Sequence, residues 1–164
     1  MQIDSLRPGG ELADAYQTYG SMLYKIAMIH LGNKEDAEEA IQETFIKLFY
    51  KAPEFSDQEH QKAWLIRVIT NHCKNMQGSI WRRRVMRVEQ IDDYFEFTST
   101  DRALMDHVLQ LPFKYKTVIH LFYYEDYSIH EISEILQISE SAVKMRLNRG
   151  RKLLRIDLEG EDEA

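Results

Sequence analysis

The side chains best suited to bind another molecule form one polar face near the C-terminus. Between residues 141 and 156 the sequence has six basic residues and no acidic one. Spacings of three and four residues place the following side chains on the outward side of one helix: Ser141, Lys144, Met145, Asn148, Arg149 and Lys152. Lys and Arg can neutralise phosphates, while Asn148 and Arg149 are chemically able to hydrogen-bond base edges. The face therefore predicts DNA binding.

A second acid-free window, between residues 61 and 88, holds seven basic residues. Its polar stripe follows helical spacing and leads into an arginine cluster: Arg67, Asn71, Lys74, Asn75, Arg82, Arg83 and Arg84. Trp64 and Trp81 bracket the stripe. Basic residues mixed with amides and rings suit single-stranded or distorted nucleic acid, whose bases can be stacked or held in pockets. A core position is the alternative interpretation for Trp64.

A third face combines acid with large apolar residues. In a helix expected to start after Asn33, these side chains share one side: Glu39, Gln42, Glu43, Ile46 and Phe49. An apolar strip rimmed by carboxylates indicates a docking surface for a basic partner helix. Alternatively, Phe49 packs under the loop at residues 53–55.

Signatures of enzyme chemistry do not occur in the sequence. The six histidines form no HExxH pair, Cys73 has no partner at CxxC spacing, and there is neither a Gly-rich phosphate loop nor a Gly-x-Ser-x-Gly elbow. We therefore expect no enzymatic activity, no metal and no cofactor.

Helices must position these faces. Apolar residues at steps of three and four predict helices over residues 12–30, 34–52 and 58–76, with Gly32 ending the first, Asn33 capping the second and Gly78 breaking the third. The inward side of the second is expected to be Ala37, Ala40, Ile41, Phe45 and Leu48. That of the third is expected to be Leu65, Val68, Ile69, His72 and Met76. The sequence has no long β-type alternation, so the fold class is all-α.

Shorter helices follow the middle of the chain. Pro112 suits the first turn of one helix, and Ser128 with Glu131 forms a capping box at the start of another. A tight turn at residues 137–139 then leads into the last helix. The resulting helix-turn-helix is held by an apolar set: Ile132, Leu136, Ile138, Val143 and Leu147. Any two amphipathic helices joined by a short turn can look like this, but the acid-free second helix favours DNA binding.

Charge and composition suggest two small helical domains. The 164 residues carry a formal net charge of −6, yet 13 of the 21 basic residues lie in the two acid-free windows. We expect a domain over residues 1–87, an acidic linker over 88–102, a second domain over 103–158 and an acidic tail over 159–164. One cysteine indicates a reducing compartment, and there is neither an apolar run of ~20 residues nor a leader pattern, so a cytoplasmic protein without membrane insertion is expected.

Four motifs in order carry a resemblance to a known family. They are DAEEAIQETF at residues 36–45, AWLIRVITN at 63–71, Leu-Pro at 111–112, and the segment 129–155 with VKMRLNRGR at 143–151. This pattern resembles the extracytoplasmic-function (ECF) sigma factors and covers roughly residues 10–155. The family usually has glycine where this chain has Gln137, and a non-glycine residue at positive φ costs on the order of 1 kcal/mol.

The resemblance implies a transcription initiation factor made of sigma domain 2 and sigma domain 4. The helix at residues 36–48 would bind the clamp of core RNA polymerase. The residues that make this contact would be Asp36, Glu39, Gln42, Glu43, Ile46 and Phe49. The flap of the polymerase would be a further contact. The −10 element would be read and opened by Lys62, Trp64, Arg67, Asn71, Lys74, Asn75, Arg82, Arg83 and Arg84. The −35 element would be read by Ser139, Ser141, Lys144, Met145, Asn148, Arg149, Arg151 and Lys152.

The resemblance also implies regulation by an anti-sigma protein, which in this family is often membrane-bound. Two other interpretations remain open. A stand-alone helix-turn-helix regulator explains residues 129–155 but gives the Arg67–Arg84 stripe and the acidic face no task. An adaptor that never touches DNA explains only the acidic faces.

Overall fold

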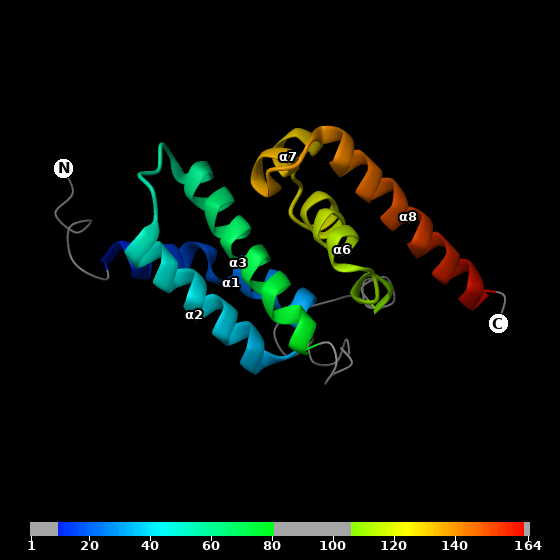
Figure 1. Cartoon of the computed structure of the whole chain (residues 1–164), viewed down its shortest axis with the longest axis horizontal. Coiled ribbons are helices and arrows are strands. Elements are labelled where there is room, and N and C mark those ends of the chain that lie inside the picture. Colours follow the sequence, from blue (N-terminus) through cyan, green and yellow to red (C-terminus); the bar gives the residue numbers. More distant parts are fainter. Residues whose placement is uncertain (1–9, 81–105, 163–164) are drawn as a thin grey trace. The chain divides into compact units, whose positions relative to one another are not determined.

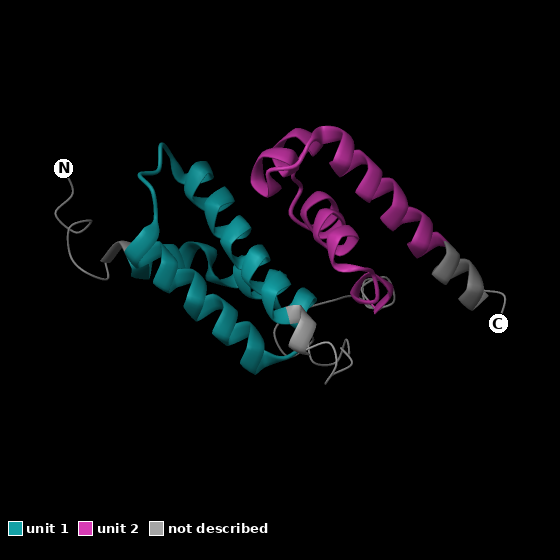
Figure 2. Ribbon diagram, in the orientation of Figure 1, with its two compact units in different colours: residues 1–84 teal, residues 85–164 magenta. Residues whose placement is uncertain are grey.

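The structure is a computed structural model that describes residues 10–80 and 106–162, with side chains within 12–76 and 106–155. Every regular element in these ranges is helical, as the sequence predicts (Figure 1). The chain divides into two compact units, residues 1–84 and 85–164 (Figure 2). The predicted linker over 88–102 lies outside the described residues, so its extent stays a prediction.

Unit 1 is a bundle of three helices: α1 (Gly10–Leu31), α2 (Lys34–Lys51) and α3 (Gln58–Ile80), each packed against the other two. Gly32 follows α1 at a φ of 80°, the left-handed region that favours glycine. Asn33 caps α2 as predicted, since its Oδ1 accepts from the backbone N–H of Asp36 at 2.9 Å. The predicted inward side of α2 is confirmed, because all five residues are buried.

The third helix differs from its prediction in two ways. Its backbone stays helical through Gly78 to Ile80, because one glycine costs a helix only about 1 kcal/mol relative to alanine and the other residues outweigh it. Leu65 and Ile69 are buried as predicted, but Val68, His72 and Met76 are only half-buried. Ile66 and Cys73 lie at the centre of the buried side instead. The inward face is therefore turned slightly from the predicted one.

Unit 2 begins, within the described residues, with helical residues 106–109 and continues through α6 (Phe113–Ile119), the π-helical turn η2 (His120–Tyr124), α7 (Ile129–Leu136) and α8 (Glu140–Asp162). Pro112 is the residue just before α6. The capping box at α7 is present in full: Ser128 Oγ accepts from the Glu131 N–H and Glu131 accepts from the Ser128 N–H, both at 3.0 Å.

The helix-turn-helix is formed by α7 and α8, which pack together. Gln137 ends α7 at φ 56° and ψ 47°, so the non-glycine left-handed residue expected in the turn is confirmed. Ile132, Val143 and Leu147 are buried, while Leu136 and Ile138 are half-buried. Ser139 Oγ then accepts from the Ala142 N–H at 3.1 Å and starts α8.

Gly150 of α8 packs closely against α6. A Cβ atom at this position would lie 3.1 Å from Ile119 Cγ1 and 3.5 Å from Tyr115 Cβ. Glycine thus lets the two helices approach more closely than an alanine would. The helix α6 consequently lies directly against the buried side of α8.

Candidate polymerase and nucleic-acid interfaces

The acid-rimmed face of α2 is exposed where the sequence predicts it. Ile46 and Phe49 are 48% and 49% exposed, and Glu39 and Gln42 are exposed beside them. The Phe49 ring contacts the Tyr50 ring edge-on at 4.8 Å and remains half in solvent, which argues against its packing under the following loop. Apolar surface held open among carboxylates can dock a partner that supplies apolar side chains and positive charge.

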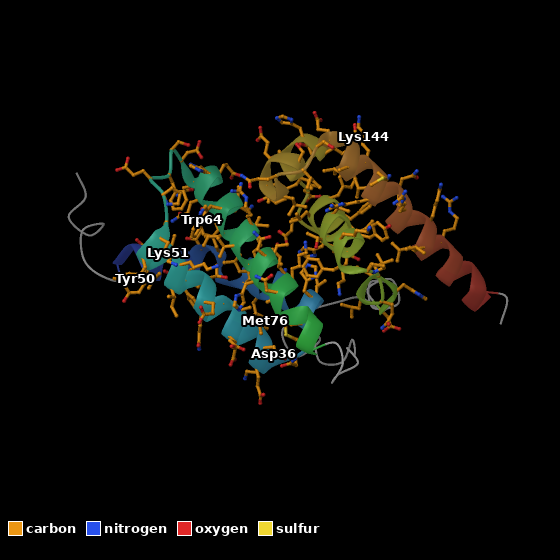
Figure 3. All side chains as sticks on the ribbon, in the orientation of Figure 1. Asp36, Tyr50, Lys51, Trp64, Met76 and Lys144 are labelled. Carbon is orange, nitrogen blue, oxygen red and sulfur yellow. The ribbon has the colours of Figure 1, made fainter. Side chains whose placement is uncertain are left out.

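Two tyrosines enlarge this face beyond the predicted set. Tyr50 is 75% exposed at the end of α2, and Tyr16 of α1 is 60% exposed while its ring lies 5.3 Å from that of buried Phe45. Asp36 lies at the opposite end of α2 from Tyr50 (Figure 3). Its carboxylate accepts a hydrogen bond from Asn33, so Asp36 serves the helix cap. Glu43 is half-buried.

The polar stripe of α3 is confirmed as one face in its described part. Asn71, Lys74 and Asn75 are exposed, and Lys62, Trp64 and Arg67 are half-buried. Figure 3 shows Trp64 near the start of α3 and Met76 toward its other end. The predicted members Arg82, Arg83 and Arg84, like Trp81, lie outside the described residues. The described part of the stripe, from Arg67 to Asn75, could therefore follow an extended nucleic-acid backbone over about two and a half turns of one helix side.

An aromatic cluster stands at the start of this stripe. Phe55 lies edge-on to the rings of both Trp64, at 5.7 Å, and His60, at 5.2 Å. Asp57 accepts from the His60 N–H at 2.7 Å, which fixes the first turn of α3. Trp64 is half-buried and so is neither a core residue nor free of neighbours. Sequence reasoning missed Phe55 and His60, although both lie within ten residues of Trp64, Phe55 in the loop before α3 and His60 in its first turn.

The predicted −35 residues are all exposed in the structure, the first of them just before α8 and the others on it: Ser139, Ser141, Lys144, Met145, Asn148, Arg149, Arg151 and Lys152. Lys144 is on the first turns of α8 (Figure 3). Ser139 also caps the helix, so its side chain has a structural role. Cations and one amide on a single helix suit the major groove of duplex DNA, which admits an α-helix.

Two of these arginines are held by tyrosines of the preceding segment. Arg151 Nε donates to the Tyr123 hydroxyl at 2.5 Å, and its guanidinium carbon lies 5.5 Å from the Tyr123 ring centre and 5.6 Å from that of Phe122. A side-chain hydrogen bond from Arg149 lowers the pKa of Tyr115, and Lys114 Nζ lies 5.2 Å from the centre of the Tyr115 ring. The sequence contains no signal for these contacts, because they cross between helices.

Neither unit contains a membrane helix among the described residues, since none of their helices is both long and apolar enough to span a bilayer.

Both units match known protein families. Residues 15–84 match the family model of Sigma-70 region 2, and residues 101–154 match that of Sigma-70, region 4. Among curated proteins, the chain is 30% identical over 177 residues to the ECF RNA polymerase sigma factor SigW of Bacillus subtilis, covering 96% of this chain and 95% of SigW.

Solved structures share the fold. The sigma factor RpoE, in complex with the anti-sigma factor NepR from Bartonella quintana, aligns with a TM-score of 0.69 at 19% identity over 91% of this chain and 97% of that one. CnrH, in complex with the cytosolic domain of CnrY, aligns with a TM-score of 0.67 at 20% identity over 91% and 88% of the two chains.

Proposed function

This chain belongs to the ECF group of the sigma-70 family of RNA polymerase sigma factors, and from that premise we propose how its surfaces divide the work of initiation. As a sigma factor it directs transcription and is not an enzyme. Unit 1 corresponds to region 2 and unit 2 to region 4. One observation carries the assignment of tasks: an acid-rimmed apolar face and two basic faces of different chemistry lie on separate helices.

Core polymerase binds the α2 face in this proposal. Ile46, Phe49 and Tyr50 supply apolar contact, and Glu39 and Gln42 supply polar contact at the rim. A hydrophobic centre with a polar rim is the usual anatomy of a protein interface. Since this face carries acid, promoter DNA is not its partner. The clamp is the expected site on the polymerase, and the flap is expected to contact unit 2.

Promoter DNA binds the other two faces. The α3 stripe with Trp64, Arg67, Asn71, Lys74 and Asn75 holds and opens the −10 element, since rings and amides can engage bases that leave the duplex. The α8 face reads the −35 element as duplex. Acid elsewhere in the chain weakens free DNA binding, and polymerase supplies the missing affinity. Isolated protein should therefore bind promoter DNA weakly and lose that binding steeply with salt.

An anti-sigma protein is the proposed regulator. In the solved structures whose fold this chain shares, the sigma factor RpoE is in complex with the anti-sigma factor NepR, and CnrH is in complex with the cytosolic domain of CnrY. The exposed apolar strip of α2 offers such a partner a surface that core polymerase also needs, so binding would be mutually exclusive. Because polymerase and promoter DNA are its targets, we propose that the protein acts in the cytoplasm.

Reconstituted run-off transcription tests the proposal. Purified bacterial core polymerase is incubated with a pool of genomic promoter fragments, with and without this protein. Transcripts that appear only on its addition, and that share two upstream elements at fixed spacing, are the expected result. A matched variant pair locates the polymerase contact. Phe49→Ser should lose transcription activity, whereas Tyr24→Phe, at a half-buried position of α1, should keep it.

Three results would oppose this assignment. Duplex binding without protein-dependent initiation would favour the stand-alone regulator. Tight, sequence-specific duplex binding without polymerase would contradict the division of labour. Full activity of the double variant Lys144→Ala with Arg149→Ala would indicate an adaptor that does not use DNA.

A further inference from the structure

The two arginines held by tyrosines lie on opposite flanks of the DNA-reading side of α8. At about 100° per residue, Arg149 is turned roughly 80° one way from Ser141, and Arg151 roughly 80° the other way. Ser141 and Asn148 lie between them on the outward side, while Val143, Leu147 and the Gly150 contact occupy the buried side. The flanks of a helix seated in the major groove face the walls of the groove, which are the phosphate backbones.

The contact of Arg151 with Tyr123 leaves the right atoms available for phosphate. Only Nε is committed to the tyrosine hydroxyl. The two terminal nitrogens, which form the fork that matches phosphate oxygens, are not used in that bond. The hydroxyl accepts from Nε and keeps its own proton to donate, so it can add a second bond to the same phosphate. Stacking against Phe122 and Tyr123 restricts the arginine further.

Arg149 is arranged in a corresponding way on the other flank. Tyr115 projects from α6 with its Cβ 3.5 Å from where a Cβ at Gly150 would lie, one residue along from Arg149, and Arg149 lowers the pKa of its hydroxyl. Lys114 adds a second cation beside the Tyr115 ring. The α6 segment contains no acidic residue, so three donors converge without a carboxylate among them.

We propose that Arg149 and Arg151 are the two phosphate anchors of the −35 interface and that Tyr115 and Tyr123 are their positioning residues. The ligand is the DNA backbone, and the bases are left to the side chains between the anchors. Holding each arginine in place before binding reduces the ordering cost when DNA arrives. The inference rests on the proposed function and extends its DNA-binding site from α8 onto α6 and η2.

Salt titration of DNA binding tests the anchors in two arms. In the first arm, the full-length protein alone is titrated with random-sequence duplex. In the second arm, holoenzyme is titrated with a promoter recovered by run-off transcription and with the same promoter after scrambling of its −35 element. Arg149→Ala and Arg151→Ala are compared with Asn148→Ala and with Lys25→Ala, which removes the same charge from unit 1. Thermal unfolding of each variant accompanies both arms.

Each arginine variant should weaken binding by roughly tenfold and reduce the slope of log affinity against log salt by about 0.9, the value for one phosphate. The loss should be equal for intact and scrambled −35 elements, whereas Asn148→Ala should affect the intact element alone. Tyr123→Phe and Tyr115→Phe should weaken binding roughly threefold to tenfold with no change of slope, because the charge remains but its placement is lost. Lys25→Ala should behave as wild type.

An unchanged slope in Arg149→Ala and Arg151→Ala overturns the proposal, as does a loss confined to the intact −35 element, which would make these residues base readers. If Arg151→Ala unfolds unit 2, Arg151→Lys replaces it, and its expected result is a retained slope with lower affinity. Reduced slopes in the first arm without protein-dependent transcription in the second would uphold the anchors and refute the sigma-factor assignment. The reverse pattern would uphold the sigma factor and refute the anchors.

Discussion

The helices α3 and α8 have the same length, 23 residues, and each buries one side and exposes a basic one, yet the neighbours of their cations differ. On α3 the cations alternate with amides and follow a ring cluster of Phe55, His60 and Trp64. On α8 the rings of Tyr123 and Phe122 lie against an arginine. Positive charge alone therefore does not distinguish α3, which is proposed to open DNA, from α8, which is proposed to bind it as a duplex. The groups placed beside the charge make the difference.

The acidic face of α2 sharpens the contrast within unit 1. It lies on the same bundle as the α3 stripe but carries carboxylates and half-exposed apolar rings. One three-helix bundle thus carries the face proposed for polymerase and the face proposed for nucleic acid on different helices. In the described part of unit 2, most of the exposed cations lie on α8.

The largest expected effect comes from truncating one large side chain in the core of each unit in turn. Leu65 in unit 1 and Leu147 in unit 2 are 0% and 1% exposed, and replacing either with alanine should lower the free energy of unfolding by about 2–5 kcal/mol. Leu147→Ala should remove hydrogen-exchange protection from α8 while α3 keeps it, and Leu65→Ala should do the opposite. Loss of protection in both units from either change would show that the two cores unfold together.

A matched pair of asparagines separates opening from duplex reading. Asn71 on α3 and Asn148 on α8 are both exposed. Each alanine variant should reduce initiation by about tenfold or more, the cost of one amide contact to a base, about 1–3 kcal/mol. A template already melted over the −10 element should restore more activity to Asn71→Ala than to Asn148→Ala. Arg67→Ala should behave as Asn71→Ala does. Equal residual defects on the melted template would remove the distinction between α3 and α8.

Two helical glycines should respond to alanine with opposite signs. At Gly20 a new Cβ meets only the Tyr16 ring at 3.8 Å, so the better helix propensity should stabilise unit 1 by about 0.5–1 kcal/mol. At Gly150 it meets Ile119 at 3.1 Å, and overpacking should destabilise unit 2 by about 1 kcal/mol after the propensity gain. Thermal unfolding of both variants measures this. A stabilising Gly150→Ala would mean that α6 and α8 can separate slightly without cost.

Sequence periodicity predicted the helices well where their ends carry local signals. Asn33 and the pair Ser128 and Glu131 are caps whose side chains bond within three residues, so spacing alone identifies them. The prediction that α3 ends at Gly78 was wrong, since the residues beyond Gly78 determine whether a helix tolerates a single glycine. The left-handed Gln137 was predictable only because the family resemblance identified the glycine position in the turn.

The site was predictable as faces but not as contacts. Exposure of the α2 and α8 residues follows from helical spacing, which is a local property. The tethering of Arg151 by Tyr123, 28 residues earlier, depends on how α6 and η2 approach α8 at Gly150. The inward phase of α3 was misjudged for a related reason: α3 packs against both α1 and α2, Ile66 and Cys73 are buried in that bundle, and one sequence does not reveal the packing.

The smallest expected effect is a difference in tyrosine ionisation between the two units. Burial, with Glu59 nearby, raises the pKa of Tyr19 above its ordinary value of 10.0, and Lys62 opposes this in part. The hydrogen bond from Arg149 lowers the pKa of Tyr115 below the same value. As the pH rises, Tyr115 should therefore lose its proton before Tyr19 does.

The sign of each linkage follows from these directions. The contribution of Tyr19 to stability is complete below pH 10 and is lost as the pH rises through its folded pKa, whereas that of Tyr115 is present above pH 10 and is lost as the pH falls through its folded pKa. Tyrosinate absorbance of Tyr19→Phe and Tyr115→Phe, subtracted from that of wild type, isolates each titration. Arg149→Ala should return the Tyr115 titration toward pH 10 and leave that of Tyr19 unchanged. If Tyr115 titrates no earlier than Tyr19 in the wild type, Arg149 does not hold Tyr115 in solution, and the contact of Arg151 with Tyr123 is what separates the cations of α8 from those of α3.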